Sequence, residues 1–264
     1  MRKGQLISKV AIVTGASSGI GRDTALAFAR EGATVIATSR NRAALDALEK
    51  AAAGFPGSIH AAVTDVTDGG QTDRLVEETV KIHGRLDILV CNAGIYTRKL
   101  IRDSAVTDYE QAMTVNFFGS IRIILKALPG MLERRSGHIV AVTSVDGKKG
   151  LTKDGVYCSS KFALTGFMDV LRQELRGTGV SATTILPGRV DTPMIENLKV
   201  PLMSAKISSA TVAHAIVRAI RKRKAEVIIP YPGPKLLILA SAVWAPLGDW
   251  LVRLFRLEGV EVRR

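Results

Sequence analysis

Short apolar runs alternate with longer helical patterns along this whole chain, and this alternation constrains the fold more than any other feature. Seven runs are predicted strands: Val10–Val13, Thr34–Thr38, Ser58–Val63, Leu86–Val90, His138–Thr143, Val180–Leu186 and Glu226–Ile229. The predicted helices between them are Ile20–Glu31, Ala43–Ala52, Gln71–His83, Tyr109–Leu128, Val156–Arg176 and Thr211–Arg221. The first strands are apolar throughout, as in a parallel sheet covered by helices on both faces. The sequence therefore predicts an α/β fold with a doubly wound parallel sheet of about seven strands.

The chain has 264 residues, of which 47% are hydrophobic, and no internal repeat. We expect a single domain over residues 1–264, in which residues 196–264 form a substrate lid and an apolar, basic extension. The two cysteines, Cys91 and Cys158, lie in apolar or small-residue contexts without metal-ligand spacing. The N-terminus lacks the continuous apolar run of a signal peptide. These features predict a cytoplasmic protein without a metal site.

The chain is strongly basic, with 37 Lys and Arg against 24 Asp and Glu, a net charge of +13. Nearly half of the excess lies in residues 218–264, which hold ten Lys or Arg and four Asp or Glu. Such a charge suits nucleic acid, an anionic membrane or an anionic ligand. The basic residues are not interleaved with aromatic ones and form no known reading motif, so we do not expect a nucleic-acid partner.

A glycine-rich turn, "TGASSGIG", joins the first predicted strand to the first predicted helix. Glycine permits a tight turn and close approach of the backbone, and the helix N-terminus offers unpaired N–H groups to a phosphate. This strand–turn–helix context predicts a Rossmann-like site for the pyrophosphate of a dinucleotide. The residues expected to contact it are Gly15, Ser17, Ser18, Gly19, Ile20 and Gly21.

The end of the second predicted strand, "ATSRN", indicates which dinucleotide binds. NAD sites typically have an acid about 20 residues after the glycines, which holds the ribose 2′-hydroxyl. Here Ser39 and Arg40 take that place, and a cation suits a 2′-phosphate. We therefore expect NADP(H) to be preferred over NAD(H), unless Arg40 points into solvent.

The next two strands end at the same edge of the predicted sheet, where ligands of such folds bind. Asp65 and Val66 follow the third strand, and the Asp65 carboxylate could accept a hydrogen bond from the adenine amino group. Asp68 suits the N-cap of the following helix. Asn92 and Gly94 follow the fourth strand and would bring backbone close to the adenosine side of the cofactor.

The stretch "YCSSK" places a phenol and an ammonium four residues apart, at Tyr157 and Lys161. On a helix these positions share a face. A nearby cation favours phenolate, so we expect Lys161 to lower the pKa of Tyr157 from about 10 towards neutrality. The tyrosine would then serve as a general acid and base. The alternative is a Tyr–Lys pair on the surface.

Taken together, these motifs resemble those of the short-chain dehydrogenase/reductase family over about residues 8–195. The matching residues are Thr14, Gly15, Gly19 and Gly21, "CNAG" at 91–94, Asn116 in "MTVNFFG", Ser144, Tyr157, Lys161, and Pro187, Gly188 and Thr192 in "LPGRVDTP". Ser144 and Tyr157 are 13 residues apart, the usual interval in the family. Cys91 is the one departure, because the family has asparagine there.

The resemblance implies an oxidoreductase with four catalytic residues. Ser144 would hydrogen-bond the substrate carbonyl, and Tyr157 would protonate it as hydride is delivered. Lys161 would lower the tyrosine pKa and hold the nicotinamide ribose. Asn116 would position a water that links Lys161 to solvent. Family members often form dimers or tetramers through the helix of Tyr157 and its predecessor, so a homo-oligomer is also expected.

The substrate is less constrained. Val190 and Thr192, after the sixth strand, would contact the nicotinamide carboxamide, and the apolar stretch "MIENLKVPLMSAKI" that follows suits a lipophilic substrate. The lysines in "VDGKKGLTKDGV" could meet a carboxylate, a phosphate or a coenzyme A tail, or could simply be solvated. Three readings remain open: an oxidoreductase for small apolar carbonyls or alcohols such as steroids, retinoids or lipids, a 3-oxoacyl-thioester reductase, and a non-catalytic NADP-binding scaffold.

The C-terminal stretch from Leu236 to Gly248 has 13 residues without a formal charge, too few for a membrane span of about 20. Beyond it, charged residues alternate with Trp250, Leu251, Leu254 and Phe255 in an amphipathic pattern. Together with "RKRK" at 221–224, this pattern fits a helix lying in the membrane interface. The alternative is a lid over the pocket or an oligomer contact.

Overall fold

The computed structural model describes residues 6–201 and 204–261; the remaining positions of the expected domain and of its lid lie outside the described residues. All seven predicted strands form one parallel sheet with the order β10-β6-β5-β4-β1-β2-β3. The strands are β1 Val10–Thr14, β2 Thr34–Ser39, β3 Ser58–Val63, β4 Ile88–Cys91, β5 Gly137–Val142, β6 Val180–Pro187 and β10 Glu226–Ile229. The predicted doubly wound α/β sheet is confirmed.

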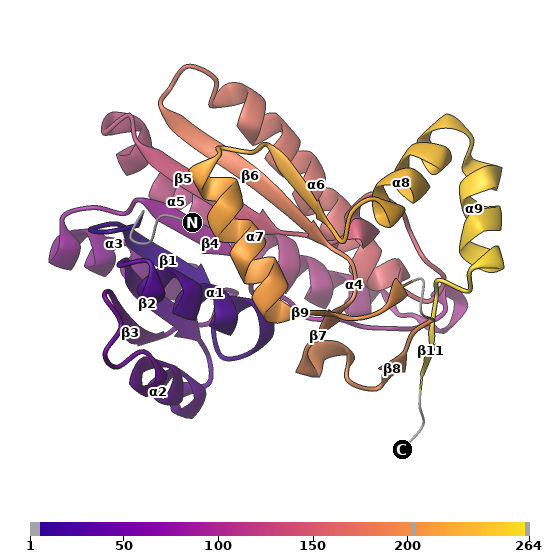
Figure 1. Cartoon of the computed structure of the whole chain (residues 1–264), viewed down its shortest axis with the longest axis horizontal. Coiled ribbons are helices and arrows are strands. Elements are labelled where there is room, and N and C mark those ends of the chain that lie inside the picture. The colour runs from indigo at the N-terminus through magenta and orange to yellow at the C-terminus, as the bar shows by residue number, and fades with distance from the viewer. Residues whose placement is uncertain (1–5, 202–203, 262–264) are drawn as a thin grey trace.

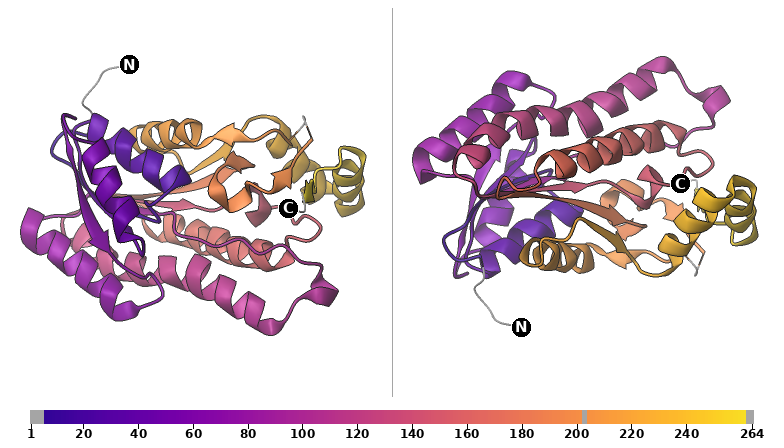
Figure 2. Two further views of the ribbon diagram at one scale, coloured as in Figure 1. Left: turned by 90° about the horizontal axis from the view of Figure 1, so that it is seen from below. Right: turned by 90° about the horizontal axis from the view of Figure 1, so that it is seen from above.

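Helices cover both faces of this sheet (Figures 1 and 2). They are α1 Gly19–Arg30, α2 Arg42–Ala51, α3 Gly69–His83, α4 Val106–Ala112, α5 Gly119–Glu133, α6 Gly155–Glu174 and α7 Ser209–Arg221. One core cluster packs α1, α2 and α7 on the sheet, and a second packs α3, α5 and α6 on the opposite face. The strands read as continuous apolar runs because both of their faces are buried.

The helix predicted over Tyr109–Leu128 is longer and less regular than expected. It runs from α4 through a π-helical segment, Met113–Phe118, into α5, which continues past Pro129 to Glu133. The predicted end before Pro129 is wrong because Met131 is fully buried and anchors the last turn. Tertiary packing here outweighs the cost of a proline inside a helix, about 3 kcal/mol, which comes from a lost hydrogen bond and a steric clash.

By length and composition, this helical stretch of residues 106–133 could cross a membrane. Its apolar side chains, however, include Ile123, Ile124 and Ala127, which pack in the core against the sheet. The hydropathy of the stretch is therefore that of a helix in a two-sided α/β core.

The C-terminal part adds elements that the sequence did not predict individually. Two small sheets pair β7 Val190–Asp191 with β9 Ile207–Ser208, and β8 Leu198–Lys199 with β11 Val260–Glu261. Two helices, α8 Gly233–Val243 and α9 Ala245–Leu254, form a hairpin that projects from the carboxyl-terminal edge of the sheet (Figure 1).

The basic run Arg221–Lys224 does not belong to this hairpin. It lies between the end of α7 and the start of β10, whereas the hairpin follows the carboxyl end of β10. Arg221 forms an ion pair of 2.5 Å with Glu31 at the end of α1. The expectation that these cations flank the apolar C-terminal segment is therefore wrong, because β10 separates the two groups.

Candidate active site

Two adjoining cavities lie beyond the carboxyl ends of the parallel strands. The cavity of about 670 Å³ lies beside the glycine turn, and the cavity of about 830 Å³ lies beside Tyr157. We call them the nucleotide cavity and the substrate cavity, names that anticipate the function proposed below. Both are lined by Ile20, Asn92, Gly94, Thr192 and Met194. One elongated ligand could therefore extend from the first into the second.

The glycine turn forms a wall of the nucleotide cavity, together with Ser17, Ser18 and Ile20. A Cβ on Gly15 would lie 2.8 Å from the Ala93 Cα, and one on Gly21 would lie 2.3 Å from the Gly15 carbonyl oxygen. Ser18, the N-cap of α1, makes no side-chain bond to the helix, which leaves the first N–H groups for a ligand. This cradle of backbone and helix N-terminus fits a pyrophosphate.

Asn92 fixes the position of that turn. Its side-chain amide donates to the carbonyl oxygens of Thr14 (3.0 Å) and Gly15 (3.2 Å), and its backbone N–H donates to the Thr14 hydroxyl (2.9 Å). Asn92 also lines both cavities. The predicted cofactor residue thus joins strands β1 and β4 where they end.

The far end of the nucleotide cavity combines the ends of β2 and β3. It is lined by Arg40, Asp65 and Val66, as predicted, and also by Ser39, Asn41 and Arg42. The hydroxyl and the backbone N–H of Thr67 both donate to Asp65 and lower the pKa of its carboxyl. Asp68 caps α3 by accepting from the Gln71 N–H at 3.0 Å, as expected.

Arg40 is exposed at the rim of this cavity. Its positive charge also contributes to the lowered pKa of Asp65. Arg42, two residues on, pairs with Asp46 at 2.7 Å, one turn further along α2. Sequence reasoning missed Arg42, although a second cation two residues after Arg40 was visible in "SRNR".

Asn116 lies in the π-helical segment and is fully buried. Its amide oxygen accepts from the Ile95 N–H at 2.7 Å, and its amide nitrogen donates to the Ile95 carbonyl (3.0 Å) and the Ser160 hydroxyl (2.9 Å). Its side chain thus holds the chain after β4 against α6. π-Helical segments frequently occur at functional sites.

Ser144 and Tyr157 meet at one end of the substrate cavity. Ser144, after β5, accepts from the Asp146 N–H at 3.0 Å, and Tyr157 projects from the first turn of α6. Burial raises the pKa of Tyr157 above its usual value, and the nearby Asp146 raises it further, while a hydrogen bond with Ser144 opposes the shift. The expected lowering of the tyrosine pKa is therefore wrong for this structure, because desolvation dominates.

Lys161 follows Tyr157 by one helical turn and is also buried. Its ammonium donates to the Val142 carbonyl oxygen at 2.9 Å and lies 5.6 Å from the centre of the Tyr157 ring. Burial lowers the pKa of Lys161 to about 8. The predicted pairing of the two residues on one helix face is confirmed, but the ammonium donates to a backbone carbonyl and faces the tyrosine ring.

The other predicted residues lie around these four. Val190, in β7, lines the substrate cavity, and Thr192 lines both cavities and packs its methyl group on Gly19. Gly21 and Asn116 line neither cavity. Gly21 packs against Gly15 and Asn92, which line the nucleotide cavity, and Asn116 holds Ile95, which does so too. Among the described residues, no group of three or more His, Cys, Asp or Glu side chains could hold a metal ion.

The substrate cavity contains polar residues that sequence reasoning did not identify. They are Tyr96, Asp146, Asp154, Arg189 and Ser204. Burial raises the pKa of Asp146 to about 7, and Asp154 adds to this shift. Asp146 lies two residues after Ser144, so its place in the cavity could have been anticipated; the others come from loops whose paths no motif specified.

The remaining walls of the substrate cavity are mostly apolar and come from α8, α9 and the loop after β7. They include Leu198, Leu236, Leu237, Ala240, Leu247, Leu251 and Phe255. Two lysines of the loop after β5 are paired with the chain's own carboxylates, Lys148 with Glu226 and Lys149 with Asp249. Lys153 is exposed.

Comparisons with known proteins agree with this architecture. The profile of the short chain dehydrogenase family matches residues 9–201. The chain is 39% identical to the 3-oxoacyl-[acyl-carrier-protein] reductase FabG of Thermotoga maritima over 74% of its own length and 79% of the relative's. It is 35% identical to the ketoacyl reductase HetN of a Nostoc species, over 85% of this chain and 79% of the relative.

A mammalian relative matches a longer part of the chain. The mouse protein named dehydrogenase/reductase SDR family member 7B is 34% identical over 245 residues, which is 86% of this chain and 75% of the relative. The match to the family profile covers well over half of the chain, and these identities extend over most of each relative. The chain therefore belongs to the short-chain dehydrogenase family and is an oxidoreductase acting on CH–OH or C=O groups.

Proposed function

We propose that this chain is an NADP(H)-dependent oxidoreductase that transfers hydride between the nicotinamide and a carbonyl or secondary alcohol of an apolar substrate of the steroid, retinoid or lipid type. The observation that carries the proposal is the substrate cavity of about 830 Å³, polar at Ser144 and Tyr157 and apolar along α8 and α9. Such a cavity orients one polar group of an otherwise apolar ligand. In this proposal residues 196–264 are the substrate lid.

The proposed mechanism assigns one task to each catalytic residue. When bound, the nicotinamide supplies the hydride, which adds to the carbonyl carbon. Ser144 donates a hydrogen bond to the carbonyl oxygen, and the Tyr157 hydroxyl gives that oxygen its proton. The raised tyrosine pKa keeps this hydroxyl protonated at neutral pH, as a general acid requires. The phenolate regains a proton from solvent along the buried Lys161.

The residues toward NADP(H) are those of the nucleotide cavity, together with Val190 of the substrate cavity. The glycine turn would hold the pyrophosphate, Asp65 and Val66 would lie at the adenine, and Arg40 would meet the 2′-phosphate. Val190 and Thr192 would contact the carboxamide. An exposed guanidinium at the end of β2, with no acid in the same place, supports NADP(H) over NAD(H).

The cofactor preference is tested with Arg40→Asp. A carboxylate would repel a 2′-phosphate and accept from a 2′-hydroxyl, so the ratio of the two dissociation constants should shift toward NAD(H) by about tenfold or more. Lys50→Asp, an exposed charge reversal on α2 outside the cavity, is the matched control. Equal shifts in both variants, or none, would contradict a role for Arg40.

The substrate class is tested by following NADPH oxidation with a panel that contains a ketosteroid, retinal, a long-chain ketone and an acetoacetyl thioester. We expect the lipophilic carbonyls to give the highest kcat/KM. The reverse reaction with the corresponding alcohols and NADP⁺ gives the direction that the enzyme favours. Turnover of the thioester alone would overturn the proposed substrate class, and no turnover of any member would overturn the proposed activity.

The second candidate is a reductase of 3-oxoacyl thioesters. It is favoured by the names of two relatives, a 3-oxoacyl-[acyl-carrier-protein] reductase and a ketoacyl reductase. Against it, two lysines that could meet a phosphopantetheine arm are engaged with Glu226 and Asp249. The same panel distinguishes the two candidates.

We also propose a homo-oligomer that pairs α5 and α6 with the same helices of a second copy. These helices lie side by side on one face of the sheet (Figure 2) and expose the large apolar side chains Leu125, Phe162 and Val170. Exposed apolar patches of this kind mark protein interfaces. Light scattering of the wild type should give a mass that is a multiple of 28.3 kDa. The double variant Leu125→Glu with Val170→Glu should have the mass of a single chain. A monomeric wild type would contradict the pairing.

Finally, we propose that this otherwise cytoplasmic enzyme associates peripherally with anionic membranes through the hairpin. Supporting residues are Leu239, Val243, Trp244, Trp250 and Leu254, all about half exposed or more. Lys235, Arg253 and Arg256 add positive charge, and Lys149 neutralises Asp249. Trp244→Ser with Trp250→Ser should abolish sedimentation with vesicles containing anionic lipid. Ile82→Ser, an exposed apolar change on α3, should not; equal partitioning of all three proteins would contradict the proposal.

A further inference from the structure

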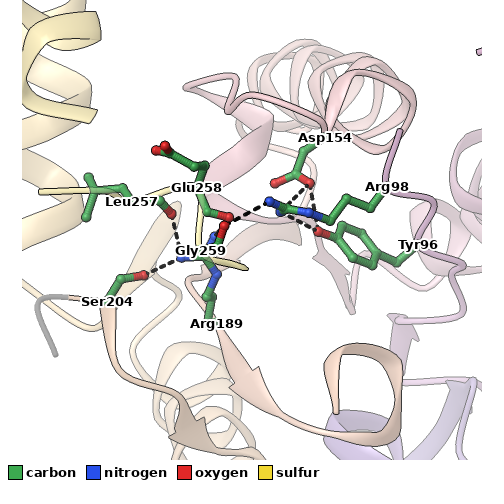
Figure 3. A network of polar contacts seen from close by, with 8 residues as sticks. All are labelled: Tyr96, Arg98, Asp154, Arg189, Ser204, Leu257, Glu258 and Gly259. Carbon is green, nitrogen blue, oxygen red and sulfur yellow. Dashed lines mark hydrogen bonds and ion pairs between the residues drawn. The ribbon is translucent and has the colours of Figure 1, made fainter. Parts of the chain in front are cut away.

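A partly buried polar network binds the C-terminal segment of residues 257–259 to the body of the molecule (Figure 3). Arg189 donates to the carbonyl oxygens of Leu257 (2.6 Å) and Glu258 (3.0 Å), and Arg98 donates to that of Gly259 (3.2 Å). Three successive backbone carbonyls thus accept from two guanidinium groups. Hydrogen bonds from a charged donor are about twice as strong as neutral ones, so the segment is firmly held.

The same network continues to the start of α6. Arg98 donates to a carboxylate oxygen of Asp154 at 3.3 Å, and the Tyr96 hydroxyl donates to the same oxygen at 2.7 Å. The side chains of Arg98 and Asp154 are only 5% and 2% exposed. Asp154 immediately precedes α6, and its carbonyl accepts from the Cys158 N–H. The network therefore fixes the first turn of the helix that carries Tyr157.

Tyr96 also touches the catalytic tyrosine directly. The rings of Tyr96 and Tyr157 pack edge to face with centroids 5.1 Å apart and an angle of 84°. Tyr96, Asp154 and Arg189 all line the substrate cavity. A continuous series of contacts thus runs from Tyr157 through Tyr96, Asp154 and Arg98 to the tail.

The tail segment is also the far anchor of the hairpin. Helix α9 ends at Leu254, three residues before Leu257, and the near end of the hairpin follows β10. Moving the hairpin away from the cavity would pull on residues 257–259 and break their bonds to Arg98 and Arg189. Arg98, which bridges the Gly259 carbonyl and the Asp154 carboxylate, would then lose its bond on the side of the tail.

We propose that Tyr96, Arg98 and Arg189 are positioning residues that make the orientation of Tyr157 depend on closure of the hairpin over the cavity. When the tail is seated, Arg98 and Tyr96 fix Asp154 and thereby the first turn of α6. When it is released, the phenol is free to leave the position from which it reaches a substrate oxygen. The inference rests on the proposed catalytic role of Tyr157.

The test compares Arg98→Met and Tyr96→Phe with Lys99→Met, which removes a neighbouring, exposed cation whose partner is Asp108 in the first turn of α4. Each is assayed with 2,3-butanedione, too short to extend along α8 and α9, and with a long-chain ketone. We expect Arg98→Met to lower kcat about tenfold or more with both substrates, since small misplacements of reacting groups cost that much. The NADPH affinity of Arg98→Met should be unchanged, and Lys99→Met should keep the wild-type kcat.

Three further results distinguish positioning from a purely structural role. The solvent deuterium isotope effect on kcat should increase in Arg98→Met, because proton transfer from a misplaced phenol becomes slower. Arg98→Lys should restore part of kcat. Tyr96→Phe, which keeps the ring but loses its hydroxyl, should give a smaller loss of kcat with an unchanged melting temperature. An effect confined to KM for the long-chain ketone would overturn the proposal and show that these residues only support the wall of the cavity.

Hydrogen exchange tests the coupling without any substrate. In Arg98→Met, the amides at the start of α6 and those of residues 257–261 should exchange faster together, while those of α3 remain unchanged. If only the tail exchanged faster, the coupling to α6 would be wrong even if the wild-type enzyme reduced carbonyls. If the wild-type chain reduced none, the proposed function would fail, and this measurement would still decide the coupling.

Discussion

The two cavities are built in opposite ways. In the nucleotide cavity, backbone packs on backbone, and Gly15 and Gly21 leave no room for even one methyl group. In the substrate cavity, side chains of α8 and α9 form the wall, and α8 has no buried residue among those described. One end of the site is thus fixed by the main chain, and the other is formed by interchangeable apolar side chains.

This difference separates what the fold must keep from what it can vary. A site made of main-chain N–H groups and glycines recognises a group common to all its ligands, which in our proposal is a phosphate. A site made of leucines and alanines on a projecting hairpin recognises shape and apolar area, and both change with single substitutions. We therefore expect substitutions in the two cavities to affect different kinetic constants.

The largest effect is expected at the polar end of the substrate cavity, where Tyr157 lies. Tyr157→Phe keeps the ring and its packing on Tyr96 but removes the transferable proton. General acid catalysis contributes about 10²- to 10⁴-fold, so kcat should fall by that much while the NADPH dissociation constant stays within about twofold. Stopped-flow turnover and fluorescence titration measure the two quantities. Retention of most of the turnover would show that another group is the acid.

A large effect on cofactor binding is expected from Gly21→Ala. The new Cβ would lie 2.3 Å from the Gly15 carbonyl oxygen, so the turn must move away from the position that we propose for phosphate binding. We expect NADPH affinity to fall by about 100-fold, or about 2.7 kcal/mol. Gly166→Ala is the control, because this exposed helical position has nothing within 4 Å of the added carbon. Similar affinities in both variants would contradict the backbone cradle.

The nucleotide cavity could be predicted from the sequence because its main-chain wall comes from one continuous segment. Strand β1, the glycine turn and α1 are consecutive in the chain, so local rules place Gly15, Ser18 and Gly21 without knowledge of the rest. The sheet could be predicted equally well, because each strand is a buried apolar run. Strands β3 and β10 have the predicted limits.

The pKa of Tyr157 and the tail network were not predictable in this way. The i, i+4 spacing of Tyr157 and Lys161 holds, but the direction of the pKa shift depends on burial and on Asp146, which reaches the site from another loop. The bonds from Arg98 to Gly259 and from Arg189 to Leu257 join residues 161 and 68 positions apart. No local pattern in the sequence marks such pairs.

A smaller effect, confined to the substrate cavity, is expected from Leu251→Ala. Leu251 lines the cavity from α9, and a buried leucine side chain is worth about 1.5–3 kcal/mol of apolar contact. Because a ligand recovers only part of that value, we expect KM for a long-chain ketone to rise about tenfold, with no change for 2,3-butanedione or NADPH. Leu254→Ala, an exposed position on the same helix, should leave all three unchanged. A change in NADPH affinity would contradict the separation of the two cavities.

The smallest effect concerns stability rather than kinetics, and it comes from Asp146. Burial and Asp154 raise the pKa of this carboxyl to about 7 from its usual value of 3.8, while Arg189, Arg98 and Ser144 oppose the shift. Between these two values the folded chain binds more protons than the unfolded chain, so stability must fall as the pH rises from about 4 to about 7. Asp146→Asn cannot ionise and should escape this loss. Because Asp146 is only partly buried, urea unfolding should find the variant about 1 kcal/mol more stable than the wild type at pH 8, with the difference shrinking toward pH 4. Parallel pH profiles would show that Asp146 is well solvated, and that the polar end of the substrate cavity is as open as its apolar rim.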